Sequence, residues 1–172
     1  IVGRSDKGRD GLDRASQEAL FGHLQKLASK SHERTNERRI FSATMAEQWV
    51  GADGWAAIEE AMRAGRLPII AAMGRNKKDK DEYRFGHMSY QEYLTGREYY
   101  QELTVAQFST AALTKLFGSQ PLHTFTDVKQ HLVLQFLADI LSPEQRTICL
   151  AVMCGGRVEA PVLVRKPSRK SA

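Results

Sequence analysis

The residues of this chain best suited to acid–base or metal chemistry are its histidines, and their spacing limits what they can do. The five histidines stand at positions 23, 32, 87, 123 and 131. None lies three or four residues from another, so the His-x-x-x-His pattern of a helical metal site is absent. Cys149 and Cys154 share one apolar stretch without metal-ligand spacing, and we predict two core thiols in a reducing compartment. We therefore expect no metal site.

Motifs for nucleotide hydrolysis and for nucleophilic catalysis do not occur in the sequence. A P-loop needs the pattern G-x-x-x-x-G-K-[ST], and the nearest candidate, Gly3 to Gly8, is followed by Arg9 and Asp10. The patterns H-E-x-x-H and G-x-S-x-G are also missing. We predict that the chain is not an enzyme, that it has no catalytic residues, and that it binds no cofactor by itself.

The first half of the chain predicts three helices followed by a β-hairpin. The expected elements are a helix over 15–30 capped by Asp13, a short strand at 39–41, and helices beginning at Thr44 and Asp53. Gly65 stands where a helix-ending glycine belongs. The apolar stretch 67–73 and the alternating stretch 82–87 flank a charged turn, which indicates a hairpin. Three helices before such a hairpin are typical of a winged helix, with the charged turn as its wing.

Capping sequences predict further helices after the hairpin. Their expected starts are Ser89 with Glu92, Thr104 with Gln107, Thr126, and Ser142 with Gln145. The first of these helices should end near Leu103, the second at Gly118, and the last at Gly155–Gly156. The predicted fold class is mainly α with a small β-hairpin, a winged helix followed by a helical bundle.

The 172 residues suit one domain or two small ones, and we predict two units with irregular ends. The expected segments are a linker at 1–14, a winged-helix-like domain at 15–103, a helical domain at 104–157, and at 158–172 a strand or coil with a basic disordered tail. The net charge of +5 comes from the two ends, since residues 15–164 hold equal numbers of acidic and basic side chains. The first residue is Ile1, which indicates a fragment or a processed product.

The longest strongly apolar stretch, 148–154, is far shorter than the roughly 20 residues that a membrane span needs. We expect an intracellular, cytoplasmic protein with no membrane span.

One segment carries a more specific pattern than the rest. Residues 83–97 read YRFGHMSYQEYLTGR, in which an aromatic-alternating strand ends at His87 and a capped helix follows. This segment resembles the end of the winged-helix domain in NACHT-type signalling NTPases of the STAND class, which include the NOD-like receptors. Their pattern is roughly [YF]-x-F-x-H-x-S-[FY]-Q-E-[YF]-x-[AT]-[AG]. The residues that fill it here are Tyr83, Phe85, His87, Ser89, Tyr90, Gln91, Glu92, Tyr93, Thr95 and Gly96.

The resemblance covers about residues 15–103 and implies a regulatory role. In that family the winged helix folds back on the nucleotide domain at rest, and the motif histidine approaches the β-phosphate of bound ADP. Carried over to this sequence, that residue is His87 alone. An imidazole can donate a charge-assisted hydrogen bond to phosphate, worth about 1.5–3 kcal/mol. Because this sequence has no P-loop, ADP or ATP would be held together with a nucleotide-binding domain on another chain or upstream.

The expected function is therefore a regulatory and interaction module, whose partner is a protein or an upstream nucleotide-binding domain. A structural subunit of a larger assembly is one alternative. A nucleic-acid-binding winged helix is another, but its recognition helix, 55–65, carries Glu59 and Glu60 against Arg63 and would repel phosphates. A simpler interpretation of His87 also stays open, in which it only ends the strand and bonds to backbone near Ser89.

Overall fold

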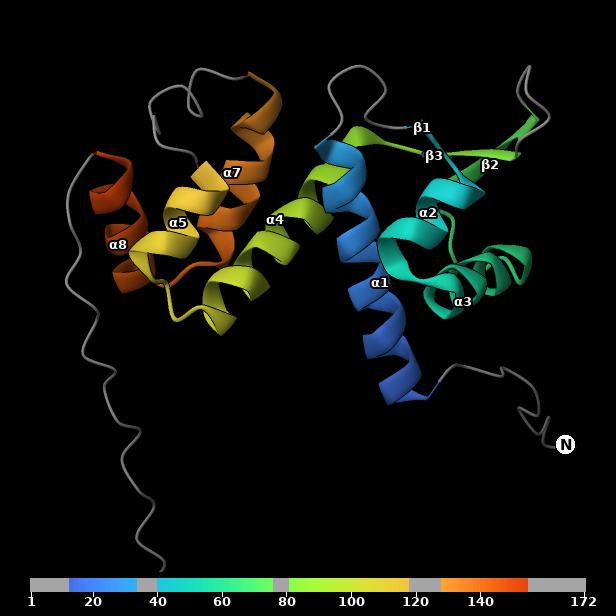
Figure 1. The fold of residues 1–172 in the computed structure, drawn as a ribbon, viewed down its shortest axis with the longest axis horizontal. Helices are drawn as coiled ribbons and strands as arrows, with labels where there is room; N and C mark the ends of the chain where they lie inside the picture. Colours follow the sequence, from blue (N-terminus) through green and yellow to red (C-terminus); the bar gives the residue numbers. More distant parts are fainter. Residues whose placement is uncertain (1–12, 34–39, 76–80, 118–127, 155–172) are drawn as a thin grey trace, which may run out of the picture. The chain divides into compact units, whose positions relative to one another are not determined.

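A computed structural model describes residues 13–33, 40–75, 81–117 and 128–154 (Figure 1). Seven helices and a three-stranded antiparallel sheet form this described part, so the predicted class, mainly α with a small β component, is confirmed. The chain divides into two compact units, residues 1–98 and 99–172. Each unit has its own hydrophobic core.

The first unit has the element order of a winged helix. Its elements are α1 (Arg14–His32), β1 (Ile40–Ser42), α2 (Ala43–Val50), α3 (Ala52–Arg63), β2 (Ile70–Arg75), β3 (Asp81–Phe85) and the start of α4 (Met88–Val105). The strands lie in the order β1-β3-β2, and both pairings are antiparallel (Figure 1). The predicted hairpin and the predicted small strand thus join in one sheet. The turn expected to form the wing, 74–81, is shorter than predicted, because Gly74 and Arg75 belong to β2 and Asp81 to β3. Residues 76–80 lie outside the described part of the chain.

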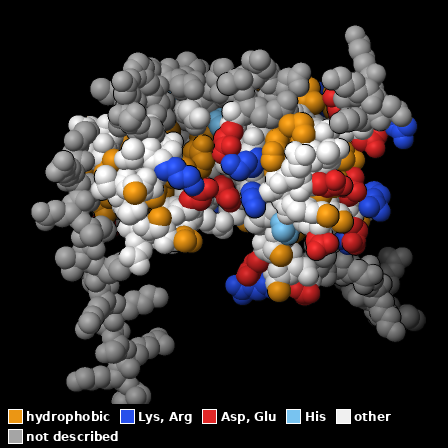
Figure 2. Space-filling view, viewed as in Figure 1, with side chains coloured by type: hydrophobic (Ala, Val, Ile, Leu, Met, Phe, Trp, Pro, Cys, Tyr) orange, Lys and Arg blue, Asp and Glu red, His pale blue; other side chains and the backbone are white. Residues whose placement is uncertain are grey.

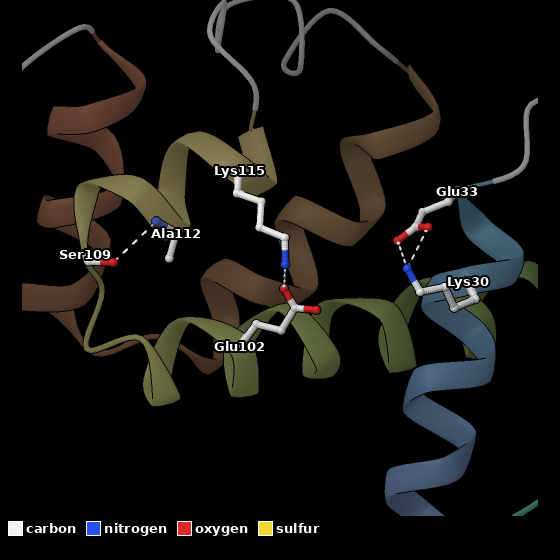
Figure 3. Close-up of polar contacts among 6 residues, drawn as sticks. All are labelled: Lys30, Glu33, Glu102, Ser109, Ala112 and Lys115. Carbon is white, nitrogen blue, oxygen red and sulfur yellow. Dashed lines mark hydrogen bonds and ion pairs between the residues drawn. The ribbon is translucent and has the colours of Figure 1, made fainter. Parts of the chain in front are cut away.

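Local capping explains where the first helices begin. Asp13 caps α1 as predicted, because its Oδ1 accepts a hydrogen bond from the backbone N–H of Ser16 at 2.8 Å. At the other end of α1, Lys30 donates to the carboxylate of Glu33 at 3.0 Å (Figure 3).

Two predicted helix starts are wrong by one or two residues. Ser42, not Thr44, caps α2, through a 3.3 Å bond from the backbone N–H of Met45. Helix α3 begins after Gly51, which makes no side-chain cap, and Asp53 lies in the first turn. The predicted end of α3 is confirmed at Gly65, whose φ of +68° suits the residue that closes a helix.

An aromatic cluster forms the centre of the first core. Phe41 on β1 is 1% exposed, and its ring centroid lies 5.8–6.3 Å from those of Trp49, Trp55, Tyr83 and Phe85. These side chains come from the sheet and from α2 and α3, so the cluster joins the two layers of the unit. Leucines of α1, together with Leu94 of α4, complete the same core.

Two helical glycines of this unit differ in the space around them. A Cβ added at Gly22 in α1 would meet nothing within 4 Å, whereas one added at Gly54 in α3 would lie 2.7 Å from Nδ1 of His23. We predict that Gly22→Ala raises the free energy of unfolding by about 0.5–1 kcal/mol, because alanine favours a helix. Gly54→Ala should lower it by about 1–3 kcal/mol through overpacking. Urea denaturation measures both changes.

The double variant Gly54→Ala/His23→Ala provides the control for this pair. Removing the imidazole should restore most of the stability that Gly54→Ala loses, because the added methyl group then has room. If Gly54→Ala stabilises the protein as much as Gly22→Ala does, the contact with His23 is not a constraint.

The second unit contains the end of α4, then α5 (Thr110–Phe117), α7 (Val128–Ile140) and α8 (Pro143–Met153). The start predicted at Thr104 is wrong, because Thr104 lies inside α4 and its hydroxyl donates back to the carbonyl of Tyr100 at 2.8 Å. Gln107 and Phe108 have φ angles of +51° and +52°, which end the helical path. Ser109 then accepts from the backbone N–H of Ala112 at 3.3 Å, just before α5 begins (Figure 3).

The predicted capping box of α8 is confirmed. The Ser142 hydroxyl accepts from the backbone N–H of Gln145 at 3.3 Å, and the Gln145 side chain accepts from the backbone N–H of Ser142 at 2.8 Å. Pro143 occupies the first turn. The last helical residue is Met153, and the glycines at 155–156 lie outside the described residues.

The two cysteines have different surroundings, and neither forms a disulfide. Cys149 is 3% exposed, as predicted for a core thiol, and burial raises its pKa to about 11. Cys154 is exposed, so the prediction of a second core thiol is wrong. Cys154 is the residue that ends α8, and the buried side of this helix consists of Cys149, Val152 and Met153.

The division between the units falls inside α4, between Glu98 and Tyr99, and not after Leu103 as predicted. Leu94 belongs to the first core, whereas Tyr99 and Leu103 belong to the second. One continuous helix therefore supplies both cores. Residues 1–12, 118–127 and 155–172 lie outside the described part of the chain, and with them most of the linker expected at 1–14, the Gly118 stop, the Thr126 cap and the tail expected at 158–172. The end of the predicted linker is wrong by one residue, because Arg14 already belongs to α1.

Candidate functional site

His87 lies in the short connection between β3 and α4. It directly precedes Met88, the first residue of α4, and its Nδ1 accepts a hydrogen bond from the backbone N–H of Ser89 at 3.1 Å. The capping box predicted at Ser89 is therefore wrong, because Ser89 is already helical and its own N–H is the group being capped. Glu92, the other half of that predicted box, is 4% exposed. The simpler interpretation of His87, a bond to backbone near Ser89, describes the contact that Nδ1 makes.

This contact fixes which nitrogen of the neutral ring carries the proton. A nitrogen that accepts a hydrogen bond has no proton of its own, so we assign the proton of neutral His87 to Nε2. The side chain is exposed. Its ring lies edge-on to Tyr90, with centroids 6.3 Å apart and an interplanar angle of 75°. His87 thus uses one nitrogen inside the fold and keeps the other as a donor.

The first turns of the helix that follows His87 carry exposed apolar and aromatic side chains. Met88, Tyr90 and Tyr93 are 37%, 51% and 39% exposed. These three residues, with His87, define what we call the α4 entry surface. Exposed aromatic side chains with a polar group are frequent at interfaces with other proteins.

Other residues of the same segment serve the fold. Gln91 and Thr95 are buried, and the Thr95 hydroxyl donates to the carbonyl of Gln91 at 2.8 Å. Leu94 packs in the first core. Arg97 places its guanidinium 5.8 Å from the ring centroid of Phe21 on α1. The motif at 83–97 therefore combines residues that position α4 with residues that face outward.

Helix α3, the recognition helix of the nucleic-acid alternative, has its charges engaged in local pairs. Arg63 lies 4.0 Å from the Glu59 carboxylate, and Arg66 lies 3.4 Å from that of Glu60. The Tyr83 hydroxyl donates to Glu59 at 2.9 Å. Burial, with this bond to Glu59, raises the pKa of Tyr83 to about 12. The sequence did not reveal the Tyr83–Glu59 contact, because it joins residues 24 positions apart.

The surface charges do not form a basic footprint on the face in view. Figure 2 shows acidic and basic side chains intermixed over the described surface there. In the second unit, for example, Lys115 lies 3.5 Å from Glu102 (Figure 3). Nucleic-acid affinity rests on phosphate contacts from Lys and Arg, and paired charges contribute little to it.

Within the described ranges, His, Cys, Asp and Glu side chains form no group of three or more that could hold a metal ion. Among the described helices, none combines the length and the apolar character that a membrane-spanning segment requires. Comparison of the sequence with models of known protein families finds no match, and a search of curated proteins finds no significant match either.

Proposed function

We propose that the chain is a regulatory and interaction module like the winged-helix region of NACHT-type STAND NTPases. In this proposal His87 donates a hydrogen bond to a phosphate of ADP or ATP, held by a nucleotide-binding domain upstream or on another chain. The observation that supports it is the cap contact, because Nδ1 bonded to Ser89 leaves Nε2–H as an outward donor. The proposed setting is the cytoplasm, and the proposed protein contact is the α4 entry surface.

A single bond of this kind is strong enough to bias a conformational switch. Hydrogen bonds to a charged group contribute about 1.5–3 kcal/mol. If the bond forms in only one of two conformations, it shifts their ratio by the same free energy, or about 10- to 150-fold. The winged helix would then favour the state in which nucleotide stays bound. No catalytic step by this chain is part of the proposal.

Substitutions at His87 separate the phosphate contact from the helix cap. His87→Ala removes both, whereas His87→Asp keeps a good capping side chain but presents a negative charge to phosphate. We expect both variants to speed ADP dissociation about tenfold or more, in the protein that contains this segment and a nucleotide-binding domain. The dissociation of a fluorescent ADP analogue measures the rate.

His87→Asn is the matched control, because it caps the helix without a negative charge and with a side chain too short to replace Nε2. If the phosphate contact is the cause, this variant also loses ADP faster while its thermal stability stays near that of the wild type. ADP retention that falls only in His87→Ala would assign the effect to the cap and contradict the proposal. A purely structural subunit would show unchanged retention in all three variants.

A further inference from the structure

The second unit holds a small apolar pocket that the proposed function does not use. Its volume is about 130 Å³. The walls come from the end of α5, from α7 with the residue after it, and from α8, and include Phe117, Leu137, Leu141, Cys149 and Met153. Four of these five side chains are less than 5% exposed, and Met153 is 8% exposed. The pocket therefore lies against the core of this unit.

The helical spacing of the lining residues explains how the pocket forms. On α7 and just beyond it, positions 134, 137, 138 and 141 recur on one face, and on α8 positions 146, 149, 150 and 153 do the same. Each face contains one small side chain, Ala138 and Cys149, where a larger one would occupy the space between the helices. Leu150, another lining residue, is 53% exposed. In the described part of the chain, the lining of the pocket thus reaches the surface at α8.

One charged group lies beside this apolar space. Arg146 is part of the lining, and its Nε donates to the carbonyl of Leu141 at 3.1 Å. That bond anchors the guanidinium at the junction of α7 and α8 and leaves its terminal NH₂ groups as donors. Arg146 forms no ion pair with any residue in the part of the chain that the structure describes.

We propose that this pocket binds a small amphiphilic anion, with an apolar group of about the size of benzene in the cavity and a carboxylate on Arg146. Apolar cavities of about 150 Å³ stay dry and take up benzene, so this one has a fitting size. A guanidinium matches a carboxylate with two parallel hydrogen bonds. The inference is independent of the role proposed for His87.

Titration of the 172-residue chain with phenylacetate, followed by NMR, tests the assignment. We expect saturable shifts of the Met153 methyl group and the Leu150 amide. Phenylacetamide, the neutral counterpart, should bind about tenfold more weakly, because it cannot form the charged pair with Arg146. Absence of saturable shifts at these two residues overturns the proposal, and equal affinities for the two compounds overturn the assignment of the carboxylate to Arg146.

Two variants test the two parts of the site. Arg146→Gln should lower phenylacetate affinity about tenfold and leave phenylacetamide affinity unchanged. Arg84→Gln, which removes an exposed arginine of β3, is the matched control and should change neither affinity. Ala138→Leu should abolish binding of both compounds by filling the cavity. Unaltered binding in Ala138→Leu, or equal losses in the two arginine variants, would place the ligand elsewhere.

Discussion

Replacing Phe41 by alanine should lower the free energy of unfolding of the first unit by about 3–5 kcal/mol. Phe41 is 1% exposed, and its ring contacts four other aromatic rings from the sheet, α2 and α3. Its removal takes away the transfer free energy of a benzyl group and leaves a cavity that rigid neighbours cannot close. The loss is comparable to the whole stability of a marginal domain.

Met73→Ala provides the control for this prediction. Met73 lies on β2 of the same sheet and is 46% exposed, so its truncation should change stability by no more than about 0.5 kcal/mol. Denaturant titration gives the two free energies, and amide hydrogen exchange in β1, β3 and α2 locates the loss. If Phe41→Ala costs as little as Met73→Ala, the aromatic cluster is not the centre of this core.

The sequence predicted the elements of this unit better than their packing. The hairpin and its helices follow from local signals, namely apolar periodicity, glycines and charged turns. The importance of Phe41 depends on its pairing with Tyr83 across β1 and β3, a contact between residues more than forty positions apart. Such a register is set by the whole sheet, so a three-residue strand cannot reveal it.

Capping residues show where local patterns fail. The box at Ser142 was correct because a proline and a glutamine agree with the serine at one position. At Ser89 and Thr104 the same spacing occurs inside α4. His87 caps the helix before Ser89, and Leu103, which packs in the second core, lies in the helical stretch that continues through Thr104. A three-residue spacing is short enough to recur by chance, and a competing neighbour then decides the start.

The sequence predicted the two candidate sites to different degrees. The aromatic alternation of residues 83–87 predicted a strand that ends at His87, but β3 ends at Phe85 and His87 lies in the bend before α4. The role of Nδ1 did not follow from this pattern, because it depends on where α4 begins. The pocket beside Arg146 could not be predicted at all, since it depends on how α7 and α8, which contribute Ala138 and Cys149 to its lining, pack in space.

Two leucines of α4 should destabilise different units when each is replaced by alanine. Leu94 is 3% exposed and belongs to the first core, whereas Leu103 is 0% exposed and belongs to the second. Each substitution should cost about 2–5 kcal/mol, because it removes a buried leucine and leaves a cavity. Leu94→Ala should speed amide exchange in α1, α2 and α3, and Leu103→Ala should speed it in α5, α7 and α8.

Val105→Ala is the control, since Val105 is 86% exposed at the end of the same helix and its truncation removes little packing. Leu94→Ala and Leu103→Ala together test the division of the units inside α4. If the boundary lay after Leu103, Leu103→Ala would destabilise the first unit instead of the second. Equal exchange in both sets of helices for both variants would mean that the two cores unfold as one cooperative unit. Different patterns would mean that α4 carries two separate sets of core contacts, in which case a ligand bound to one unit need not stabilise the other.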